Sequence, residues 1–332
     1  MANINARKVL EMGGGTLLVS IPKDWARRNG VQKGATLAVE EISGSKLMIR
    51  PIEHRGEEGR GISIGYPGEG PGSVANEVTG AYLLGYDTIR VEAKSVIGRE
   101  DRAMLKGTVN RLVGLEIVDE DSKKMTLQFL LEPTAFVPEK IVRRISGLLD
   151  GMLRDTAEAL SKRDQKLMAL VGERDDEVDR LYFLLVRATR AAIVRPEVAE
   201  GYGLTQVDLL DYRVLASFLE SVGDAVTSLS KNLNEASLPK QLSKQYASCV
   251  VKLKEMNELA TMAFITRKAS RQRPLTTKLA QTAAEVSETL AQISRDPVEK
   301  GSDFAETIAS LDRVEKLLVD ISDLAVAAQP LG

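Results

Sequence analysis

The sequence predicts a multidomain protein with a small β domain, a small α/β middle segment and an all-α C-terminal domain of two three-helix bundles. Three changes in pattern along the 332 residues support this prediction. Residues 1–52 hold short apolar runs, residues 62–132 alternate strand-like and helix-like segments, and residues 137–329 repeat apolar residues at helical spacing. We expect these three ranges to be domains, with a charged, glycine-containing linker at 54–61.

The first domain is expected to contain three strands and one short helix. Short apolar runs predict strands at Leu17–Ile21, Thr36–Val39 and Leu47–Ile49. A helix is predicted over Pro22–Gly30, because proline favours the first turn of a helix and glycine favours its end. A domain of roughly fifty residues buries little core alone, so we expect a second copy of the chain to complete it.

The middle segment alternates four predicted strands with two predicted helices. The strands are expected at 62–64, 88–91, 115–118 and 125–131, and the helices at 76–84 and 99–112. This order, β-α-β-α-β-β, predicts a small α/β layer. The glycine-rich stretch Gly65–Gly72 precedes a helix but lacks the GxxxxGK[ST] pattern, and its prolines remove backbone donors, so we expect a plain loop there.

The last domain is predicted to be helical nearly throughout. Polar and proline-containing breaks divide it, at Lys162–Asp164, Pro196, Leu238–Pro239, Gln272–Pro274 and Asp296–Pro297. They leave about six helices of roughly 20 to 30 residues, which is long for globular helices. Long helices joined by short loops form bundles, and two sets of three are the natural arrangement.

Positive charge is concentrated at the front of the chain. The whole protein carries a net charge of −2, whereas residues 1–50 hold eight basic and four acidic residues, a net of +4. Basic side chains on a rigid dimer contact DNA phosphates and give salt-dependent binding. The candidate DNA-binding residues are Arg7, Lys8, Lys23, Arg27, Arg28 and Lys46.

Cysteine and histidine chemistry is largely excluded by count. The chain has one cysteine, Cys249, and one histidine, His54, so it lacks a disulfide framework, a cysteine-built zinc site and an HExxH motif, and it has no Ser-His-Asp set in the bundle. We therefore expect a protein that is not an enzyme. The N-terminus has no long apolar core, and no uncharged apolar run reaches the roughly 18 residues of a membrane helix, so we expect a cytoplasmic protein without membrane insertion.

Two pairs of acidic residues carry the sharpest chemical signal. Asp175 and Asp179 form one pair at i, i+4, and Glu220 and Asp224 form the other. Residues four apart share a helix face, and like charges there oppose the helix by roughly 0.2–0.5 kcal/mol. None of the four has a lysine or arginine three or four residues away on its own helix.

Four such carboxylates on consecutive helices repel one another unless a positive group lies between them. Oxygen-only ligands favour hard cations such as Mg²⁺ or Mn²⁺, with iron as a further option. The candidate metal ligands are therefore Asp175, Asp179, Glu220 and Asp224. The alternative is that these acids are solvated, or pair with Arg187, Arg190 or Lys231 from other helices.

Two stretches of the last domain resemble the PhoU family. These are Glu173–Arg187, with the run ERDDEVDRLY, and Leu219–Val226, with the run LESVGDAV. The resemblance spans roughly Val137 to Ala328. It implies two three-helix bundles, metal clusters on repeated acidic motifs, and a cytoplasmic role in restraining phosphate uptake and phosphate-sensing kinases.

The front of the chain resembles the AbrB/SpoVT family. The resemblance rests on Gly13–Gly15, Leu17–Lys23, Asn29–Gly34 and Lys46–Pro51, and covers about the first 52 residues. It implies a swapped-hairpin domain, an interleaved homodimer and DNA binding, although Gly15-Thr16 stands where family members usually have an arginine. A PhoU-like back joined to an AbrB-like front resembles the archaeal type of phosphate uptake regulator.

The second half of the bundle departs from the family pattern. Asp312-Arg313-Val314-Glu315-Lys316 stands in the last helix, where a second acid is expected at Lys316. The preceding helix offers Glu285 and Glu288, which are three residues apart. We expect Lys316 to pair with Asp312 at i, i+4, which makes a second metal cluster doubtful.

The sequence thus supports a regulator of phosphate uptake and phosphate homeostasis that binds DNA and carries a metal-binding sensory bundle. One alternative is an adaptor that docks on a phosphate transporter or sensor kinase and uses its front domain only to dimerise. A carboxylate metalloenzyme is disfavoured, because bundle di-iron enzymes use a Glu-x-x-His motif and no histidine accompanies these acids.

Overall fold

The computed structural model describes residues 6–41, 47–51, 60–68, 72–132, 136–235, 239–267, 271–295 and 302–327. The chain folds into two compact units, Met1–Glu58 and Gly59–Gly332. His54 and most of the expected linker lie outside the described residues, as do Lys46 and residues 69–71 of the glycine-rich stretch.

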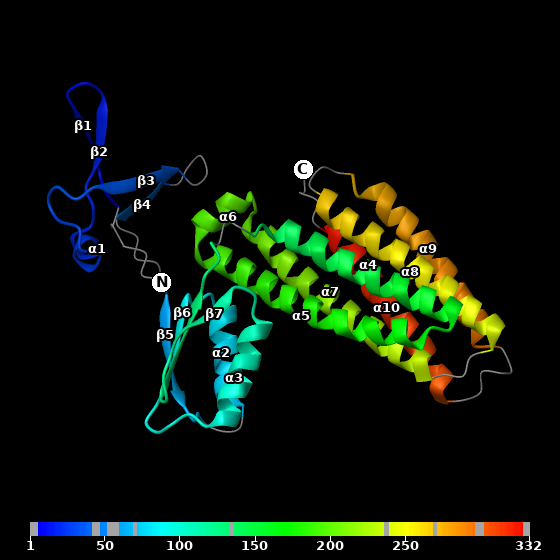
Figure 1. Cartoon of the computed structure of the whole chain (residues 1–332). Coiled ribbons are helices and arrows are strands. Elements are labelled where there is room, and N and C mark those ends of the chain that lie inside the picture. The colour runs from blue at the N-terminus through cyan, green and yellow to red at the C-terminus, as the bar shows by residue number, and fades with distance from the viewer. Residues whose placement is uncertain are drawn as a thin grey trace. The chain divides into compact units, whose positions relative to one another are not determined.

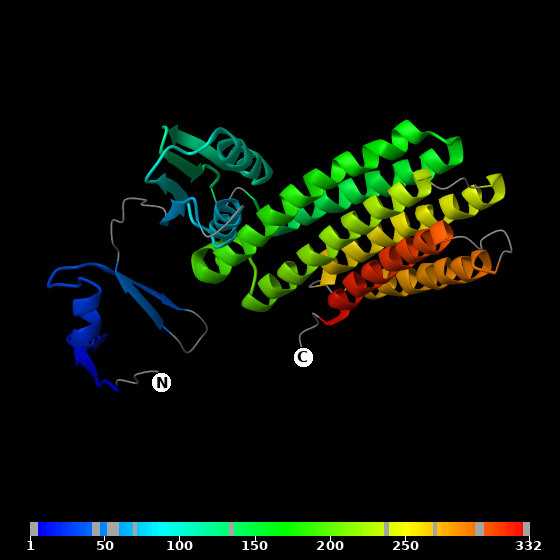
Figure 2. The same ribbon diagram turned by 90° about the horizontal axis from the view of Figure 1, so that it is seen from below.

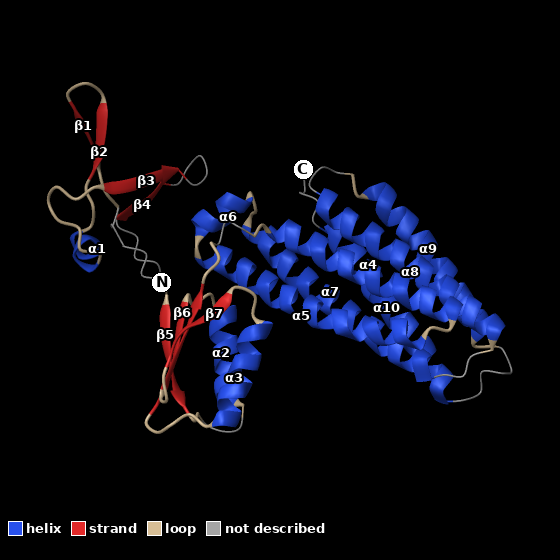
Figure 3. Ribbon diagram, in the orientation of Figure 1, coloured by secondary structure: helices blue, strands red, loops and turns tan. Residues whose placement is uncertain are grey.

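The first unit consists of two β-hairpins with a short helix between them (Figure 3). β1 (Val9–Met12) pairs antiparallel with β2 (Thr16–Val19), and β3 (Leu37–Glu41) pairs antiparallel with β4 (Leu47–Pro51). α1 (Lys23–Arg28) follows Pro22 as predicted. Gly14 and Gly15 form the first turn with φ values of 99° and 85°, a conformation that glycine adopts without the Cβ clash of other residues.

Most of the apolar side chains of both hairpins are exposed. Those of β1 and β2 include Leu10 at 63% and Leu17 at 67% exposure, and those of β3 and β4 include Val39 at 59% and Leu47 at 68%. Contiguous exposed apolar surface on a small unit marks an interaction site.

The second unit begins with an α/β layer. Its elements are β5 (Gly61–Tyr66), α2 (Ser73–Leu83), β6 (Thr88–Ala93), α3 (Arg99–Arg111), β7 (Leu115–Glu120) and β8 (Lys124–Phe129). The sheet has the order β5-β6-β8-β7, with β5 and β6 parallel and the other pairs antiparallel. The predicted order of strands and helices is therefore confirmed.

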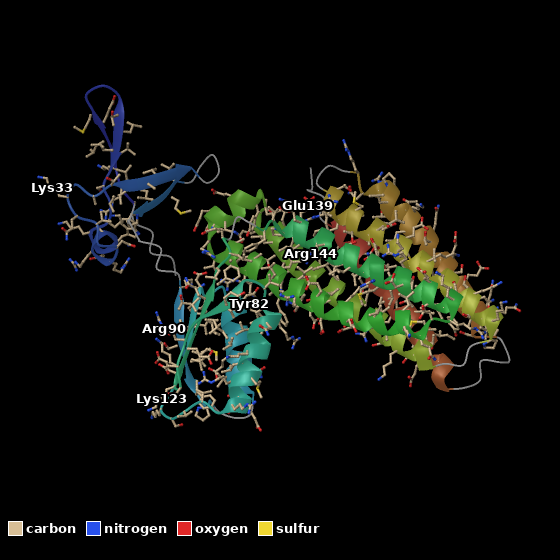
Figure 4. The ribbon with its side chains drawn as sticks, viewed as in Figure 1. Lys33, Tyr82, Arg90, Lys123, Glu139 and Arg144 are labelled. Carbon is tan, nitrogen blue, oxygen red and sulfur yellow. The ribbon has the colours of Figure 1, made fainter. Side chains whose placement is uncertain are left out.

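Both helices of this layer cover the same face of the sheet (Figure 1). Alternation along β6 directs Ile89 and Val91 into the core and Arg90 to solvent. Figure 4 labels Arg90 on the side of the sheet away from α2 and α3, and Lys123 at the end of the sheet in the turn between β7 and β8. The open face of the sheet is thus polar, as expected for a sheet covered on one side only.

The rest of the second unit is helical (Figure 2). It comprises α4 (Pro138–Lys162), α5 (Gln165–Val194), the short α6 (Pro196–Tyr202), α7 (Gln206–Glu235), α8 (Lys240–Thr266), α9 (Arg273–Ile293) and α10 (Ser302–Ala327). α4, α5 and α7 pack as one set of three, α8, α9 and α10 pack as the other, and the sets meet through α4 with α8 and α7 with α10. The predicted fold class is confirmed.

Local sequence signals explain several of the helix ends. Asp164 caps α5, since its Oδ1 accepts from the backbone N–H groups of Lys166 and Leu167 at 3.0 and 3.1 Å. Pro138 and Pro196 stand in the first turns of α4 and α6, where no intrahelical donor is lost. Gly203 ends α6 with φ at 64°.

The α/β layer is joined to the bundle by a buried arginine. Arg187 on α5 is 2% exposed, and its Nη1 donates to the backbone oxygens of Tyr82 and Tyr86 at 2.6 and 2.9 Å. Its Nη2 donates to Oδ1 of Asp87 at 3.1 Å, and its guanidinium lies 3.7 Å from the ring centroid of Phe129. Tyr82 is labelled in Figure 4 at this joint between α2 and the bundle. Because the layer is anchored on α5, it lies beside the helix that carries the first acidic pair.

None of the described helices combines the length and the low polarity that crossing a membrane requires.

Candidate functional site

The four candidate metal ligands lie on two helices that pack side by side. Asp175 and Asp179 are on α5, and Glu220 and Asp224 are on α7. We call these four residues the acid row. Asp175, Asp179 and Glu220 are half-buried, whereas Asp224 is exposed. Their placement facing a neighbouring helix agrees with the way the acids run into the apolar stripe of α5.

A glycine on α7 lets the two helices approach at the acid row. A Cβ at Gly223 would lie 2.7 Å from Oδ1 of Asp175 and 3.2 Å from Cγ1 of Val178. The Asp175 carboxylate thus packs directly on the backbone of α7. Its Oδ1 is buried and makes no hydrogen bond within 3.5 Å among the described residues. Its burial carries a desolvation cost, against which the Thr227 side chain lowers the pKa of the Asp175 carboxyl.

Burial, together with repulsion between neighbouring carboxylates, raises the pKa of three acids of the row. The pKa of Asp175 is raised to about 6, first by burial and then by the charges of Asp224 and Asp179. Burial likewise raises the pKa of Glu220, and the same two aspartates add to the effect. Perturbed carboxyl groups of this kind concentrate at functional sites.

One cation reaches the acid row from outside the bundle. Nη2 of Arg111, the last residue of α3, lies 3.2 Å from Oδ2 of Asp179. The pKa of Asp179 is nevertheless raised, because burial outweighs the lowering effect of Arg111. Sequence reasoning missed Arg111, since it precedes Asp179 by 68 residues and belongs to another layer of the fold.

Among the described residues, no ion pair joins the basic residues proposed as alternative partners, Arg187, Arg190 and Lys231, to the acid row. Arg187 donates its hydrogen bonds to Tyr82 and Asp87 of the α/β layer instead. Other charged residues of the motif face α4: Arg174 pairs with Asp155 at 2.6 Å, and Glu177 pairs with Arg144 at 2.7 Å. The motif on α5 therefore divides into a structural side toward α4 and the acid row toward α7.

The donor chemistry of the acid row fits a hard cation, since all its ligand atoms are carboxylate oxygens and one of them is buried. In their present rotamers, however, no three His, Cys, Asp or Glu side chains of the described residues are gathered closely enough to hold a metal ion. Cation binding would therefore draw these side chains together.

The second half of the bundle neutralises its own acids. Nζ of Lys316 lies 2.6 Å from Oδ2 of Asp312, so the predicted i, i+4 pair is confirmed. Glu285 pairs with Lys252 on α8 at 2.9 Å. These ion pairs distinguish this half from the acid row.

The first unit presents its candidate DNA-binding side chains to solvent. Arg7, Lys8, Lys23, Arg27 and Arg28 are all exposed, whereas Lys46 lies outside the described residues. Lys23, Arg27 and Arg28 come from α1, and Arg27 lies 3.9 Å from Asp24 in an exposed pair. Such a pair is weak in water and leaves the guanidinium available to a phosphate.

The raised pKa of Asp175 predicts how stability depends on pH. The folded protein binds the proton more tightly than the unfolded chain, whose aspartate pKa is 3.8, so the stabilisation is complete below pH 3.8 and is lost as pH rises through about 6. We expect Asp175→Asn, in EDTA-treated protein, to raise the free energy of unfolding at pH 8 by on the order of 1 kcal/mol, a figure reduced because the carboxyl is half-buried. The gain should shrink at pH 4.

Denaturant unfolding of both proteins at the two pH values measures this difference. Asp176→Asn, at the exposed neighbouring position, is the matched control and should change stability little at either pH. An Asp175→Asn variant that is less stable than the native protein at pH 8 would contradict the expected repulsion.

Two stretches of the chain match models of known protein families. Residues 142–233 match the model of the PhoU domain, and residues 12–57 match the model described as antidote-toxin recognition MazE, bacterial antitoxin. Two solved structures are similar at 16% identity and a TM-score of 0.45, PhoU from Pseudomonas aeruginosa and the phosphate transport system regulatory protein PhoU from Streptococcus pneumoniae. Each match covers 57% of this chain, and 93% and 91% of those chains respectively. A search of curated proteins gave no match.

The matched stretch 142–233 covers most of α4, α5 and α7, and so contains the whole acid row. Both resemblances expected from the sequence are confirmed. The chain joins a PhoU domain to an N-terminal domain of the MazE/AbrB type.

Proposed function

We propose that this protein regulates phosphate uptake and phosphate homeostasis from the cytoplasm, with the PhoU domain as its sensor and the N-terminal unit as its DNA-binding part. The observation that carries the proposal is the acid row, a set of mutually repelling carboxylates inside the stretch that matches the PhoU domain. A regulatory rather than catalytic role agrees with the match, which is to no catalytic family.

The sensor part rests on a cation held by Asp175, Asp179, Glu220 and Asp224. Such an ion supplies positive charge, and Mg²⁺, Mn²⁺ or iron suits the carboxylate oxygens. Asp175 contributes a buried oxygen, and Gly223 lets this carboxylate pack against the backbone of α7. The two helices then share one ion, so its binding alters the packing of α5 against α7.

Metal analysis of purified protein tests the sensor. We expect the native protein to bind Mn²⁺ in stoichiometric amount and Asp175→Asn with Glu220→Gln to lose it while retaining its helicity by circular dichroism. The double variant Asp312→Asn with Glu315→Gln removes two acids from α10 and serves as the matched control. Stoichiometric Mn²⁺ in the Asp175 and Glu220 double variant would defeat the proposed site.

The DNA-binding part rests on the exposed cations of α1 and on Arg7 and Lys8, which precede β1. Two copies of the first unit, joined through the exposed apolar hairpins, would present these cations twice on one rigid dimer. Each phosphate contact lowers the logarithm of the binding constant by roughly 0.9 per tenfold rise in salt. Affinity for duplex DNA is thus expected to fall steeply with salt.

Fluorescence anisotropy with a labelled duplex and full-length protein tests this part. We expect Lys23→Ala, Arg27→Ala and Arg28→Ala together to abolish measurable binding and to flatten the salt dependence. Arg90→Ala with Lys123→Ala removes two exposed charges from the α/β layer and is the control. Unchanged affinity in the triple variant would favour the second candidate, an adaptor that docks on a phosphate transporter or sensor kinase and uses its first unit only to dimerise.

A further inference from the structure

We propose that the groove between α4 and α8 is a docking site for an acidic amphipathic helix of a partner protein. The groove lies where the two sets of three helices meet, and Figure 1 shows the two helices side by side. Its volume is about 700 Å³. The inference is independent of the acid row, which lies on α5 and α7, and of the DNA-binding part.

The two helices that form the walls of the groove run antiparallel. Ser243 on α8 donates to the backbone oxygen of Leu160 on α4 at 2.7 Å, and Asn257 on α8 donates to that of Ser146 on α4 at 3.1 Å. The lining residues fall within 154–161 of α4 and 244–254 of α8. At a rise of about 1.5 Å per residue these stretches are roughly 10–15 Å long, so a helix lying in the groove contacts it over two to three turns.

Small side chains leave room between the walls. Ala157 and Ser161 line the groove from α4, and Ala247 and Ser248 line it from α8. Residues four apart share a helix face, and the face that carries Ala247 also carries Val251, which is 57% exposed. Larger side chains of another helix fit into such a depression as ridges into a groove. The partner's contacting face is therefore apolar.

Charge complementarity makes the partner acidic. The groove is lined by three basic residues, Arg154, Lys244 and Lys254, and by one acidic residue, Glu158, a net of +2. Glu158 and Lys254 are each already paired with a residue four positions further along their own helix, at 2.6 Å. Opposite charges guide two surfaces together, and like charges exclude wrong partners. A basic helix would be repelled from this groove.

Two of the lining cations are available to a partner. Lys244 forms no ion pair within the part of the chain that the structure describes. The Arg154 side chain is 63% exposed and lies 3.5 Å from Asp155, which Arg174 holds more closely at 2.6 Å. Carboxylates of a docked helix can therefore pair with Arg154 and Lys244 without breaking a close ion pair.

The positions of these two cations predict the sequence pattern of the partner. Lys244 follows Ser243 and so lies level with Leu160, whereas Arg154 is roughly 10 Å away along α4 at about 1.5 Å per residue. The cations thus stand on opposite walls, toward opposite ends of the groove. A helix lying along it reaches both with carboxylates about two turns apart and turns the apolar residues between them toward Val251.

Selection from a peptide library with the full-length protein tests the docking site. The peptides have about 18 residues, long enough to form a helix, and keep one apolar stripe fixed while charge varies elsewhere. We expect the enriched peptides to be acidic, with carboxylates about two turns apart beside the stripe. Arg154→Glu with Lys244→Glu should weaken the binding of an enriched peptide roughly tenfold or more, because like charges then face each other.

A matched control and a second variant separate charge from shape. Lys140→Glu with Arg313→Glu makes the same change of charge at exposed positions outside the groove and should change the affinity little. Ser248→Trp fills the groove at an exposed position without changing the charge and should abolish binding. Circular dichroism of each variant checks that its helices are retained.

Loss of binding in both groove variants, with the control intact, supports the inference. Enrichment of basic or uncharged peptides, or no enrichment at all, overturns it. An acidic peptide whose affinity the groove variants leave unchanged binds elsewhere on the protein and also overturns it. If inorganic polyphosphate binds the native protein and not the Arg154 and Lys244 double variant, and no peptide does so, the groove takes a simple polyanion instead of a helix. None of these results depends on bound metal or DNA, so the proposed function is tested separately.

Discussion

Arg187→Ala is expected to lower the free energy of unfolding by about 3–5 kcal/mol, because it breaks a buried charged network. The substitution leaves the backbone oxygens of Tyr82 and Tyr86 without their donor and Asp87 without its cation. It also removes a guanidinium stacked on Phe129. Although burial lowers the pKa of Arg187 to about 10, the side chain remains charged at neutral pH, so the full network is lost.

Thermal unfolding measures the loss of stability, and hydrogen exchange shows which part of the protein unfolds first. We expect the α/β layer to lose protection before the bundle does, so that one transition becomes two. Arg190→Ala, one turn along the same helix, removes a half-buried arginine that lies outside this network and is the matched control. Equal stability of the two variants would show that the joint does not depend on Arg187.

Arg267→Ala is expected to have an effect of similar size, about 3–5 kcal/mol, on the packing of α7 against the end of α8. Arg267 is 2% exposed, and its Nη2 lies 3.2 Å from Oδ1 of Asp208 and 3.8 Å from Oδ2 of Asp211. Its Nη1 donates to the backbone oxygen of Phe264 at 2.8 Å, and its guanidinium lies 3.7 Å from the Phe264 ring centroid. Removing it takes the cation away from Asp208 and Asp211, although Oδ2 of Asp208 still accepts hydrogen bonds from Thr205.

Chemical denaturation with a probe of helix content measures this loss. Arg271→Ala, an exposed arginine four residues later, should change the free energy of unfolding by less than about 0.5 kcal/mol. A loss for Arg267→Ala no larger than this control would contradict the proposed role of the network. Because the contacts of Arg267 are to Asp208, Asp211 and Phe264 and not to the acid row, Mn²⁺ stoichiometry should be unaffected at temperatures where the variant is folded.

The repeat of apolar residues at helical spacing predicted the long helices, because this pattern depends only on residues that are close together in the sequence. The six long helices begin and end near the predicted breaks, and only α6, a single short segment after Pro196, was not separated from its neighbours. β1 was missed because Val9–Met12 is a four-residue run without strong alternation. Its pairing depends on the turn at Gly14 and Gly15, which places it against β2.

The acid row could be predicted for the same reason, since i, i+4 spacing on a helix dictates a shared face. Its ion-pair partner, Arg111, could not be predicted. Arg111 and Arg187 act across separations of 68 and about 100 residues, and nothing in their immediate sequence distinguishes them from other arginines. Contacts of this kind depend on how the layers are assembled, which the helical and strand patterns do not specify. Lys316 was predictable because its partner, Asp312, is on the same helix.

The anchor at Arg187 has a practical consequence for dissecting the protein. A bundle fragment that starts at Phe136 would carry a bare guanidinium on α5, together with apolar surface that the sheet and α2 normally cover. Such a fragment is a poor choice for crystals or titrations. A fragment that starts at Arg60 retains Tyr82, Asp87 and Phe129, the groups that shelter this arginine, and is the shorter piece on which the chain's back half can be studied intact.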